Sequence, residues 1–489
     1  MIPLAVALGY LALTTVLGTR LARRARSAEE WTVAGGRMGL ALLAAGVAGT
    51  RIGGAGTYGV AGNVVTGGVW NLWWYAISTL LAMALMGLFF AVPYRRLRLQ
   101  TVGEIFRLRF GSRRSQALTS FCVQSEYFVV NVIEAYVIGV ILAGLTGLPM
   151  SATVAAAAVL LVSYTALGGL WGAAFTNLVH CTVILFGLLA VGLLGVERLG
   201  GWEAMTVRVG EHLARAGRDE QTFWSFTGGG IGPILGMVFA AAAHTPAASI
   251  YTNFSSAARS ERLLLPGFLL AGAIAALMPL LAGLIGIETL ALHGFEGGRQ
   301  GYLNITALAT EVSPWLGGAA VAAVLAAVIS TGGPVLLSSA TMLVRDWMPQ
   351  RASDPLPAYR AATVVYGLLA AAIAWVVSRT GASLLDLLLL AYAMVVPPAV
   401  AVGYLLYWRR TTEAGAFWGM AVGYAAGATQ YALVRFRGHE LDPSYLTTLV
   451  PLALVPLVSL LTAERTEGKE AFYARLRSPR ERSGAASAR

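Results

Sequence analysis

The chain has 489 residues, of which 57% are hydrophobic and only 12% are charged, and its formal net charge is +11. So apolar a composition excludes an ordinary soluble domain and predicts an all-α integral membrane protein, since a transmembrane barrel would show short alternating segments instead. The arginines lie between the apolar stretches, where they meet anionic headgroups of membrane lipid, so the basic charge does not predict nucleic-acid binding.

Apolar windows bounded by breaks predict about thirteen transmembrane helices, because about twenty apolar residues cross a bilayer core as a helix. The first window lacks the basic segment of a signal peptide, so we expect a retained helix there. The predicted helices cover residues 2–19, 38–62, 67–92, 115–147, 150–169, 173–196, 227–253, 261–288, 313–345, 358–378, 382–408, 414–433 and 444–462.

Arginine is distributed unevenly over the loops between these helices. The odd-numbered loops hold arginine-rich runs, such as residues 20–26, 95–98 and 107–114, whereas the short even-numbered loops hold few basic residues. Cytoplasmic loops carry the excess of positive charge. We therefore expect a multi-pass protein of the plasma membrane, with the N-terminus outside and the C-terminus in the cytoplasm.

No hydrophilic segment is long enough to fold as a catalytic domain of its own. The largest, residues 197–226, has about thirty residues of mixed charge, and domains usually need about 50 or more. The charged tail after residue 462 predicts a short helix followed by disorder. We therefore expect the function to reside within the membrane.

The second span contains VAGTRIGGAGTYGVAG, residues 47–62, a glycine-rich run that includes the charged Arg51. Glycine in a membrane helix is often explained by close helix packing, which is the alternative here. Glycine at this density also weakens a helix, and interrupted helices form the substrate and ion sites of secondary transporters. We predict that the second span is interrupted.

A second interruption is predicted in the seventh span, which opens with TGGGIGP and continues through AAAHTPAAS. Pro246 removes one backbone hydrogen-bond donor from this helix. His244, two residues earlier, is either a hydrogen-bonded packing residue or a ligand or proton relay that faces a cavity.

Two interrupted spans, each opening a set of about five helices, predict a core of two inverted five-helix repeats, with one extra N-terminal and two extra C-terminal helices. The alternative is two independently kinked helices. The expected parts are an extra helix with its cytoplasmic loop at 1–37, a first repeat at 38–196, a second repeat at 227–409, two C-terminal helices at 410–462 and a cytoplasmic tail at 463–489.

The ninth span contains AAVISTGGPVLLSSATMLVRDW. Ser330 and Thr331 follow Ala327 by three and four positions and precede Gly332, Gly333 and Pro334, where we expect the backbone to loosen. One carbonyl and two hydroxyls on one helical face, opposite free carbonyls of the broken second span, would give a small hard cation an oxygen cage.

These motifs together resemble the sodium:solute symporter family, carriers of proline, pantothenate, sugars and choline with the leucine-transporter-type inverted-repeat fold. The resemblance extends over residues 25–430. The matching patterns, in chain order, are AGGR, AGTRIGGAGTYGVAG, GLFFAVPYRRLRLQTVGEIFRLRFGSR, YTALGGLWGAAFTNLVH, AAVISTGGPVLLSSATMLVRDW and YLLYWRRTTEAGAFWGM.

The resemblance implies one bound sodium ion between the second and ninth spans. Carried over by position, its ligands are the carbonyls of Gly49, Ile52 and Ala327 and the hydroxyls of Ser330 and Thr331. The resemblance also implies a solute site beside the ion, formed by residues near the two interruptions: Arg51, Gly53, Gly54, His244, Thr245 and Pro246.

The chain departs from the family pattern at several charged positions. Arg51 stands where proline carriers have an aspartate, and Asn177 and His180 stand where most members have an acid and a glutamine. Gly333 falls where an acid is frequent. The chain has therefore lost negative charge along the coupling path.

Three hypotheses account for Arg51, which as a buried arginine needs a partner. It pairs with an acid of the fourth span, preferably Glu134 and otherwise Glu126, and leaves sodium coupling intact. It binds the carboxylate of an anionic or amino-acid solute through its fork of donors. Or its guanidinium replaces the ion, which would make transport independent of sodium or coupled to protons.

Aromatic residues are expected to contribute little to the solute site. Trp70, Trp73, Trp74 and Tyr75 cluster at the outer end of the third span, where amphipathic rings anchor a helix at the membrane interface. The interrupted helices carry few large rings. This disfavours choline as the solute, because a quaternary ammonium group prefers an aromatic cage.

The function predicted from these residues is sodium-coupled symport of a small organic solute by alternating access. A competing hypothesis is a non-transporting membrane sensor on a transporter scaffold. An intramembrane enzyme is a weaker alternative, because Ser330 has no histidine or lysine base nearby in sequence. The sequence identifies neither the solute nor the oligomeric state.

Overall fold

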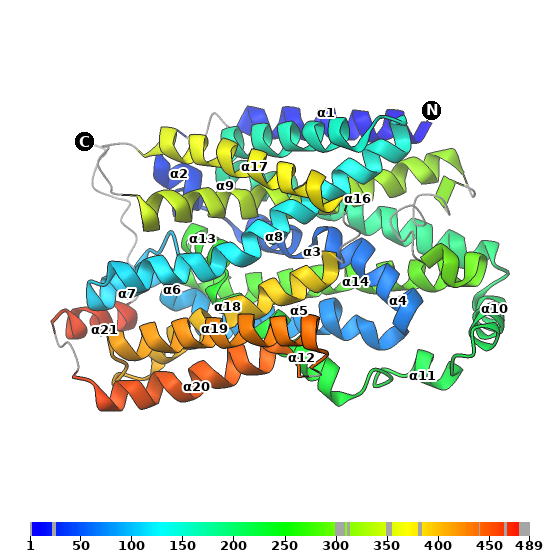
Figure 1. The fold of residues 1–489 in the computed structure, drawn as a ribbon. Helices are drawn as coiled ribbons and strands as arrows, with labels where there is room; N and C mark the ends of the chain where they lie inside the picture. The colour runs from blue at the N-terminus through cyan, green and yellow to red at the C-terminus, as the bar shows by residue number, and fades with distance from the viewer. Residues whose placement is uncertain are drawn as a thin grey trace.

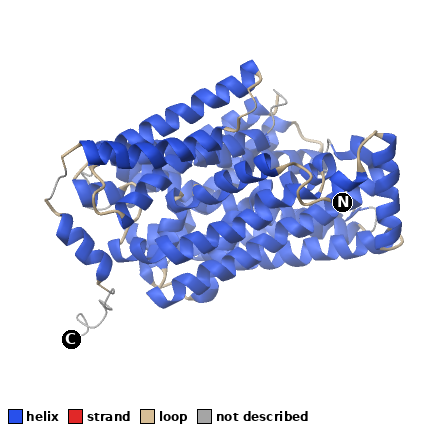
Figure 2. Cartoon of the chain, turned by 90° about the horizontal axis from the view of Figure 1, so that it is seen from below, coloured by secondary structure: helices blue, strands red, loops and turns tan. Residues whose placement is uncertain are grey.

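The structure, a computed structural model, describes residues 2–21, 26–298, 309–310, 313–348, 355–379, 384–439, 441–463 and 467–478. Within these ranges the chain forms helices joined by turns, with one isolated bridge between Met38 and Ala258. The long helices lie side by side in one bundle (Figure 1), which Figure 2 shows from below. The predicted all-α class is confirmed.

The regular helices follow the predicted spans closely in position. In chain order they are α1 (Ile2–Leu21), α2 (Ala28–Val33), α3 (Leu40–Gly54), α4 (Val60–Gly67), α5 (Ser78–Leu85), α6 (Ala91–Leu97), α7 (Glu104–Phe110), α8 (Arg113–Thr146), α9 (Met150–Arg198), α10 (Trp202–Arg215), α11 (Glu220–Trp224), α12 (Ile231–Ala243), α13 (Ser249–Ala257), α14 (Leu264–Gly298), α16 (Pro314–Met342), α17 (Leu356–Val377), α18 (Leu384–Tyr407), α19 (Glu413–Arg437), α20 (Pro443–Leu461) and α21 (Lys469–Arg477).

Eight helical segments of the described chain are long and apolar enough to cross a membrane, and a bent pair formed by Ile231–Ala247 and Ser249–Ala257 makes a ninth. Two shorter apolar helices, Ile2–Gly18 and Met150–Ser163, fall below that length. The protein is therefore a multi-pass membrane protein with eight or nine spans by this criterion, fewer than the thirteen predicted.

The break predicted in the second span is present. Gly53 has φ of 50° and ψ of 177°, which breaks the helical backbone at the end of α3. The chain then continues through a π-helical turn at Ala55–Gly59 into α4. A side chain is strained at such a positive φ, and glycine is not. The density of glycine in this span thus reflects a required backbone conformation.

The predicted interruption of the seventh span is also present. Helix α12 ends at Ala243, a short turn covers Thr245–Ala247, and α13 leaves at an angle of 51°. The proline ring fixes its own φ and removes the donor that would continue the helix.

Helix α16 differs from its prediction. It runs without a break from Pro314 to Met342, so the expected loosening at Gly332–Pro334 is wrong. Its apolar window is entirely buried, and it packs against α3, α8 and α9. Tight packing on all sides keeps the helix continuous, although Pro334 leaves the Ser330 carbonyl without its usual helical donor.

Helix α9 covers both the fifth and the sixth predicted spans. The two are separated by a kink at Gly169 (φ 57°) and not by a loop. At this kink α2 lies so close that a Cβ on Gly169 would be 3.0 Å from the Trp31 carbonyl oxygen.

The segments outside the bundle are more ordered than predicted. Residues 197–226 contain helix α10, whose Met205, Val209 and Leu213 are buried, and the tail contains α21, as expected. Residues 479–489, where we expect disorder, lie outside the described residues. The start of α1 and α10 lie at one end of the bundle, and α7 and α21 at the other (Figure 1).

Close packing of small residues generates a stability prediction. A Cβ on Gly286 of α14 would lie 2.5 Å from the backbone oxygen of Ala61 in α4, and backbone cannot give way easily. We expect Gly286→Ala to destabilise the protein by roughly 1–3 kcal/mol, as overpacking does. Gly9→Ala is the control, because nothing lies within 4 Å of its added Cβ. Thermal unfolding of the purified variants measures both, and equal stability of the two would contradict this packing.

Candidate functional site

The break in α3 frees backbone groups in the middle of the bundle, and Glu134 of α8 binds one of them. The amide of Gly54 donates to both carboxylate oxygens of Glu134, at 3.3 Å and 3.2 Å. A Cβ on Gly53 would lie 2.7 Å from Glu134 Oε1 and 3.2 Å from the Thr331 hydroxyl. Glu134 therefore caps the continuation of the broken helix and leaves no space for a side chain there.

Two hydroxyls of α16 converge on the same break from the opposite side. Ser330 Oγ lies 2.9 Å from the Gly49 carbonyl oxygen and 2.8 Å from the Ala327 carbonyl oxygen. Thr331 Oγ1 lies 3.0 Å from the Gly49 oxygen. Both side chains are buried. Four of the five predicted ion ligands thus lie within hydrogen-bonding distance of one another.

Ile52, the fifth predicted ligand, is not part of this hydrogen-bonded group. Its carbonyl accepts the amide of Ala55, the residue that caps α3 after the break. A carbonyl oxygen has two lone pairs, so this hydrogen bond leaves the Ile52 oxygen able to bind an ion as well.

Asn177 of α9 has a position that the sequence does not reveal. Its amide nitrogen donates to the carbonyls of Ser330, at 3.1 Å, and Gly46, at 3.0 Å. The Ser330 carbonyl is the one that lacks a helical donor because Pro334 has no N–H. An aspartate could not donate here, so the asparagine suits a proline at position 334.

His180, one turn after Asn177, contacts a different helix. Its Nδ1 is hydrogen bonded to the hydroxyl of Tyr10 in α1, and its Nε2 makes no hydrogen bond within the described residues. The structure therefore places His180 between α1 and α9 and outside the group of predicted ion ligands.

Arg51 is buried and projects from α3 toward α5 and α12. Its Nη2 donates to the carbonyl of Ala241 at 2.8 Å, and its Nε donates to the Thr79 hydroxyl at 3.2 Å. The guanidinium carbon is 5.5 Å from the ring centres of both Tyr75 and Tyr392. The carboxyl end of a helix and the faces of aromatic rings both stabilise a cation, and these neighbours explain the buried charge.

The predicted ion pair between Arg51 and Glu134 does not occur in the structure. Glu134 is turned to the free amide of Gly54, and the guanidinium is turned to the end of α12. The other candidate, Glu126, has its Oε1 3.7 Å from Nε2 of His244, while its Oε2 makes no hydrogen bond in the part of the chain described.

His244 links the broken seventh span to Arg51. Its Nδ1 lies 2.7 Å from the Ala240 carbonyl, so Nδ1 carries the proton, and its Nε2, 3.4 Å from Arg51 Nη1, accepts. The imidazole stacks on Tyr392 with ring centres 4.2 Å apart. His244 is thus a neutral, hydrogen-bonded side chain that faces the candidate site.

Thr245 and Pro246, the two residues after His244, contribute to the candidate site mainly through the backbone turn that they form. The hydroxyl of Thr245 donates to the Ala241 carbonyl at 3.3 Å, and the Pro246 carbonyl accepts the hydroxyl of Tyr94 at 2.5 Å. Both residues are buried and fix the end of α12, which Arg51 contacts.

A small cavity of about 20 Å³ joins these groups. It is lined by Arg51, Glu126, Glu134 and Thr331, among others. Such a volume holds about one water molecule. The cavity therefore lies against both the α3 break and the α16 hydroxyls, in an arrangement too tight for an organic solute.

Aromatic residues contribute more to the candidate site than the sequence predicted. Trp74 and Tyr75, expected as interfacial anchors, are buried, and the Tyr75 hydroxyl lies 3.0 Å from that of Tyr392. Tyr127 and Tyr251 complete a set of four tyrosines along the cavity. These rings come from four different helices, so only the packing brings them together.

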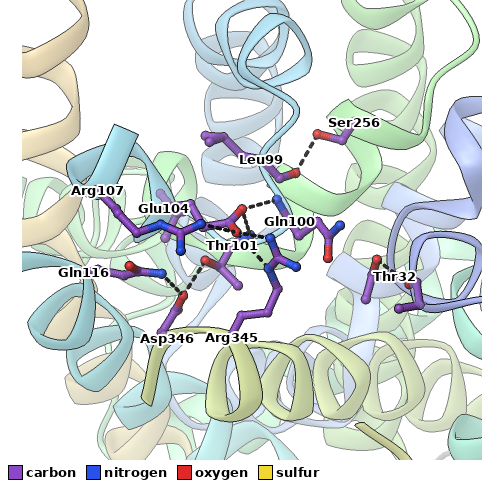
Figure 3. Close-up of polar contacts among 12 residues, drawn as sticks. Thr32, Leu99, Gln100, Thr101, Glu104, Arg107, Gln116, Ser256, Arg345 and Asp346 are labelled. Atoms are coloured by element: carbon purple, nitrogen blue, oxygen red, sulfur yellow. Dashed lines mark hydrogen bonds and ion pairs between the residues drawn. The ribbon is translucent and has the colours of Figure 1, made fainter. Parts of the chain in front are cut away.

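A polar network that the sequence analysis also missed lies at the α7 end of the bundle (Figure 3). Glu104 accepts from Arg345 Nε and from the amide of Gln100, both at 2.7 Å. Asp346 accepts from Gln116 Nε2 at 2.7 Å. The network thereby ties the segment after α6 to the start of α8 and the end of α16.

Comparison with solved structures places this fold among membrane transporters. A Na⁺-coupled sialic acid symporter in a substrate-bound outward-open state has a TM-score of 0.78 at 19% identity, covering 95% of this chain and 98% of that one. Mhp1, a nucleobase-cation-symport-1 family transporter, has a TM-score of 0.60 at 17% identity, covering 91% and 98%. The fold is of the leucine-transporter type.

The model of the sodium:solute symporter family matches residues 31–423, and the chain belongs to that family. Sodium/glucose cotransporter 1 of Oryctolagus cuniculus is 24% identical over an alignment of 473 positions, which covers 87% of this chain and 69% of that protein. The protein is therefore a sodium-coupled solute symporter and not an enzyme, and its ion is a co-substrate.

The role of Asn177 as a donor can be tested directly. We expect Asn177→Asp to destabilise the protein by about 1–3 kcal/mol, because two buried carbonyls lose their donor and face a carboxylate instead. Thr182→Ala is the control on the same helix, since this exposed hydroxyl bonds to Leu178 one turn earlier. Thermal unfolding at neutral pH compares them, and unchanged stability of Asn177→Asp would exclude the donor role.

Proposed function

We propose that the sodium ion binds between the break in α3 and the two hydroxyls of α16. Its ligands are the carbonyls of Gly49, Ile52 and Ala327 and the hydroxyls of Ser330 and Thr331. The observation that carries this proposal is the convergence of both hydroxyls on the Gly49 carbonyl. Carbonyl and hydroxyl oxygens are ligands that hard cations prefer.

Arg51 does not replace this ion in our proposal. Its donors face Thr79, Ala241 and His244, on α5 and α12, while the ion ligands lie toward α16. The guanidinium is therefore held on the solute side of the break, which supports sodium-coupled transport over the sodium-independent and proton-coupled alternatives.

We propose further that the solute carries a carboxylate, which Arg51 binds together with groups at both breaks, Gly53, Gly54, His244, Thr245 and Pro246. Glu126 offers a buried carboxylate oxygen without a hydrogen-bond partner in the described chain, on the wall of the same cavity. A cation and an anion facing one space suit a zwitterion. An amino acid is thus the solute class that we favour.

The relatives allow other solutes. Their names include a glucose cotransporter and a sialic acid symporter, the latter for a sugar that carries a carboxylate. Because the cavity holds only about one water, any of these solutes binds when one side of the bundle has opened, as alternating access requires.

The proposed topology has thirteen spans, with the N-terminus outside and the C-terminus in the cytoplasm of a plasma-membrane protein. It adds five spans to the eight long apolar segments described above. The added spans are α1, the broken pair α3–α4, the first half of α9, the bent pair α12–α13 and α19. Residues 38–196 and 227–409 form the two repeats. Residues 1–37 and 410–462 are the added helices, and 463–489 the tail. The start of α1 and helix α21 lie at opposite ends of the bundle (Figure 1), which supports an odd number of spans.

The ion site predicts a specific loss of sodium affinity. We expect Ser330→Ala to raise the sodium concentration for half-maximal uptake about 10- to 100-fold, as expected for one contact to a charged group. Thr341→Val is the control, because this buried hydroxyl of α16 bonds to Leu337 within its own helix. Uptake into proteoliposomes at graded sodium concentrations measures the shift. Equal sodium dependence of Ser330→Ala and the unchanged protein would refute the site.

The solute site predicts both a ligand class and its dependence on Arg51. Amino acids should raise the thermal stability of the purified protein in sodium more than in potassium, and more than sugars or simple carboxylates do. In Arg51→Gln this stabilisation should be lost, since one bidentate pair is removed. If sugars alone stabilise the protein, and do so equally in Arg51→Gln, the carboxylate proposal is wrong while sodium coupling stands.

A further inference from the structure

A second cavity, of about 450 Å³, lies beside the polar network of Figure 3. It is lined by residues of α7, of the start of α8 and of the segment that follows α16, which begins with the helical turn Leu343–Trp347. Four of them are arginines, Arg107, Arg113, Arg114 and Arg345, and we refer to this space as the arginine cavity. The one acid among the described lining residues is Asp346.

Two of these arginines already have acidic partners. Arg345 donates to Glu104 at 2.7 Å and 2.5 Å, and Arg114 forms an ion pair with Glu413 in which its Nε lies 2.8 Å from the carboxylate. Their charges are therefore largely neutralised.

The other two arginines retain free donors. Arg107 lies 3.8 Å from Glu104, a carboxylate that Arg345 already occupies, and its side chain is 38% exposed. Arg113 forms no ion pair with the described residues. Among the residues that the structure describes, the arginine cavity thus has an excess of positive charge and of N–H donors without an acceptor.

The acid that lines the cavity does not offset this excess. Asp346 Oδ1 accepts from Thr101 and Gln116, and its Oδ2 faces Gly103, where an added Cβ would lie 3.4 Å away. Asp346 thus makes its hydrogen bonds within the network of Figure 3 and forms no ion pair with Arg107 or Arg113 among the described residues.

We propose that the arginine cavity binds a phosphate-type oxyanion, held by Arg107 and Arg113. The planar fork of donors in arginine matches phosphate oxygens. The positive end of α8, a helix of 34 residues that begins at Arg113, adds to the attraction. A space of this size takes a phosphodiester with its attached group.

The surroundings indicate the headgroup of an anionic lipid as the source of this phosphate. Trp347 and Met348, which line the cavity, are 49% and 47% exposed and follow the buried α16 after the four residues Leu343–Asp346. Tryptophan at such a boundary is typical of the membrane interface, and basic pockets between transmembrane helices bind anionic headgroups. Free inorganic phosphate has the same chemistry and is the alternative source.

The position of the site gives binding a consequence beyond the proposed transport cycle. The ligand contacts α7, α8 and the end of α16, which the network of Figure 3 joins in this arrangement. A ligand favours the state to which it binds more tightly. An anionic lipid here therefore stabilises the arrangement in which the network of Figure 3 is formed.

The test compares Arg107→Gln/Arg113→Gln with a matched double variant, Arg259→Gln/Arg262→Gln, which removes the same charge from exposed arginines that do not line the cavity. Phosphatidylglycerol, phosphatidylcholine and sodium phosphate are titrated separately into the purified full-length protein, and thermal unfolding is followed. We expect phosphatidylglycerol to stabilise the unchanged protein and the control, with affinity about 30-fold lower in the cavity variant.

Further variants keep the outcome decisive. Arg107→Lys/Arg113→Lys retains the charge and should keep most of the binding, and Arg113→Gln alone replaces the double variant if that does not fold. Stabilisation by sodium phosphate that depends on Arg107 and Arg113 would support the site with free phosphate as its occupant. If neither phosphate nor phosphatidylglycerol stabilises the unchanged protein, or if both stabilise the cavity variant equally, the proposal is refuted.

Discussion

The structure depends on one backbone break in the middle of the bundle, at Gly53. An interrupted helix inside an apolar environment leaves amides and carbonyls without partners, and each unsatisfied group is costly. Here Glu134 binds the freed amide of Gly54, and the hydroxyls of Ser330 and Thr331 bind the Gly49 carbonyl. The two hydroxyls and the Gly49 carbonyl also belong to the oxygen cluster that we assign to sodium. Stability of the break and function of the site therefore rest on the same atoms.

The second broken helix is joined to the first through a buried cation. The guanidinium of Arg51 lies at the carboxyl end of α12, against its Ala241 carbonyl and the Nε2 of His244. A negative helix end and two tyrosine rings replace the acid that an ion pair would need. This arrangement leaves Glu126 and Glu134 available for other partners, so the loss of negative charge at position 51 does not remove the acids from the cavity.

One departure from the family pattern, Asn177, is connected with a proline of α16. Pro334 deprives the Ser330 carbonyl of its donor, and Asn177 supplies one from α9. A side chain that only accepts would leave this carbonyl unpaired beside the ion site. The asparagine in place of an acid thus maintains the geometry of Ser330, the residue whose hydroxyl faces Gly49.

The sequence by itself determined the membrane class, the breaks in the second and seventh spans and the ligand-type residues of α16. These follow from composition, from glycine and proline at a few positions and from spacing along one helix, all of which are local properties. Only the tertiary structure decided that Glu134 binds the Gly54 amide and not Arg51, that α16 continues as a helix through Pro334, and that tyrosines of four helices line one cavity. A partner from another helix is set by packing between segments far apart in the chain, which periodicity and motif spacing do not encode.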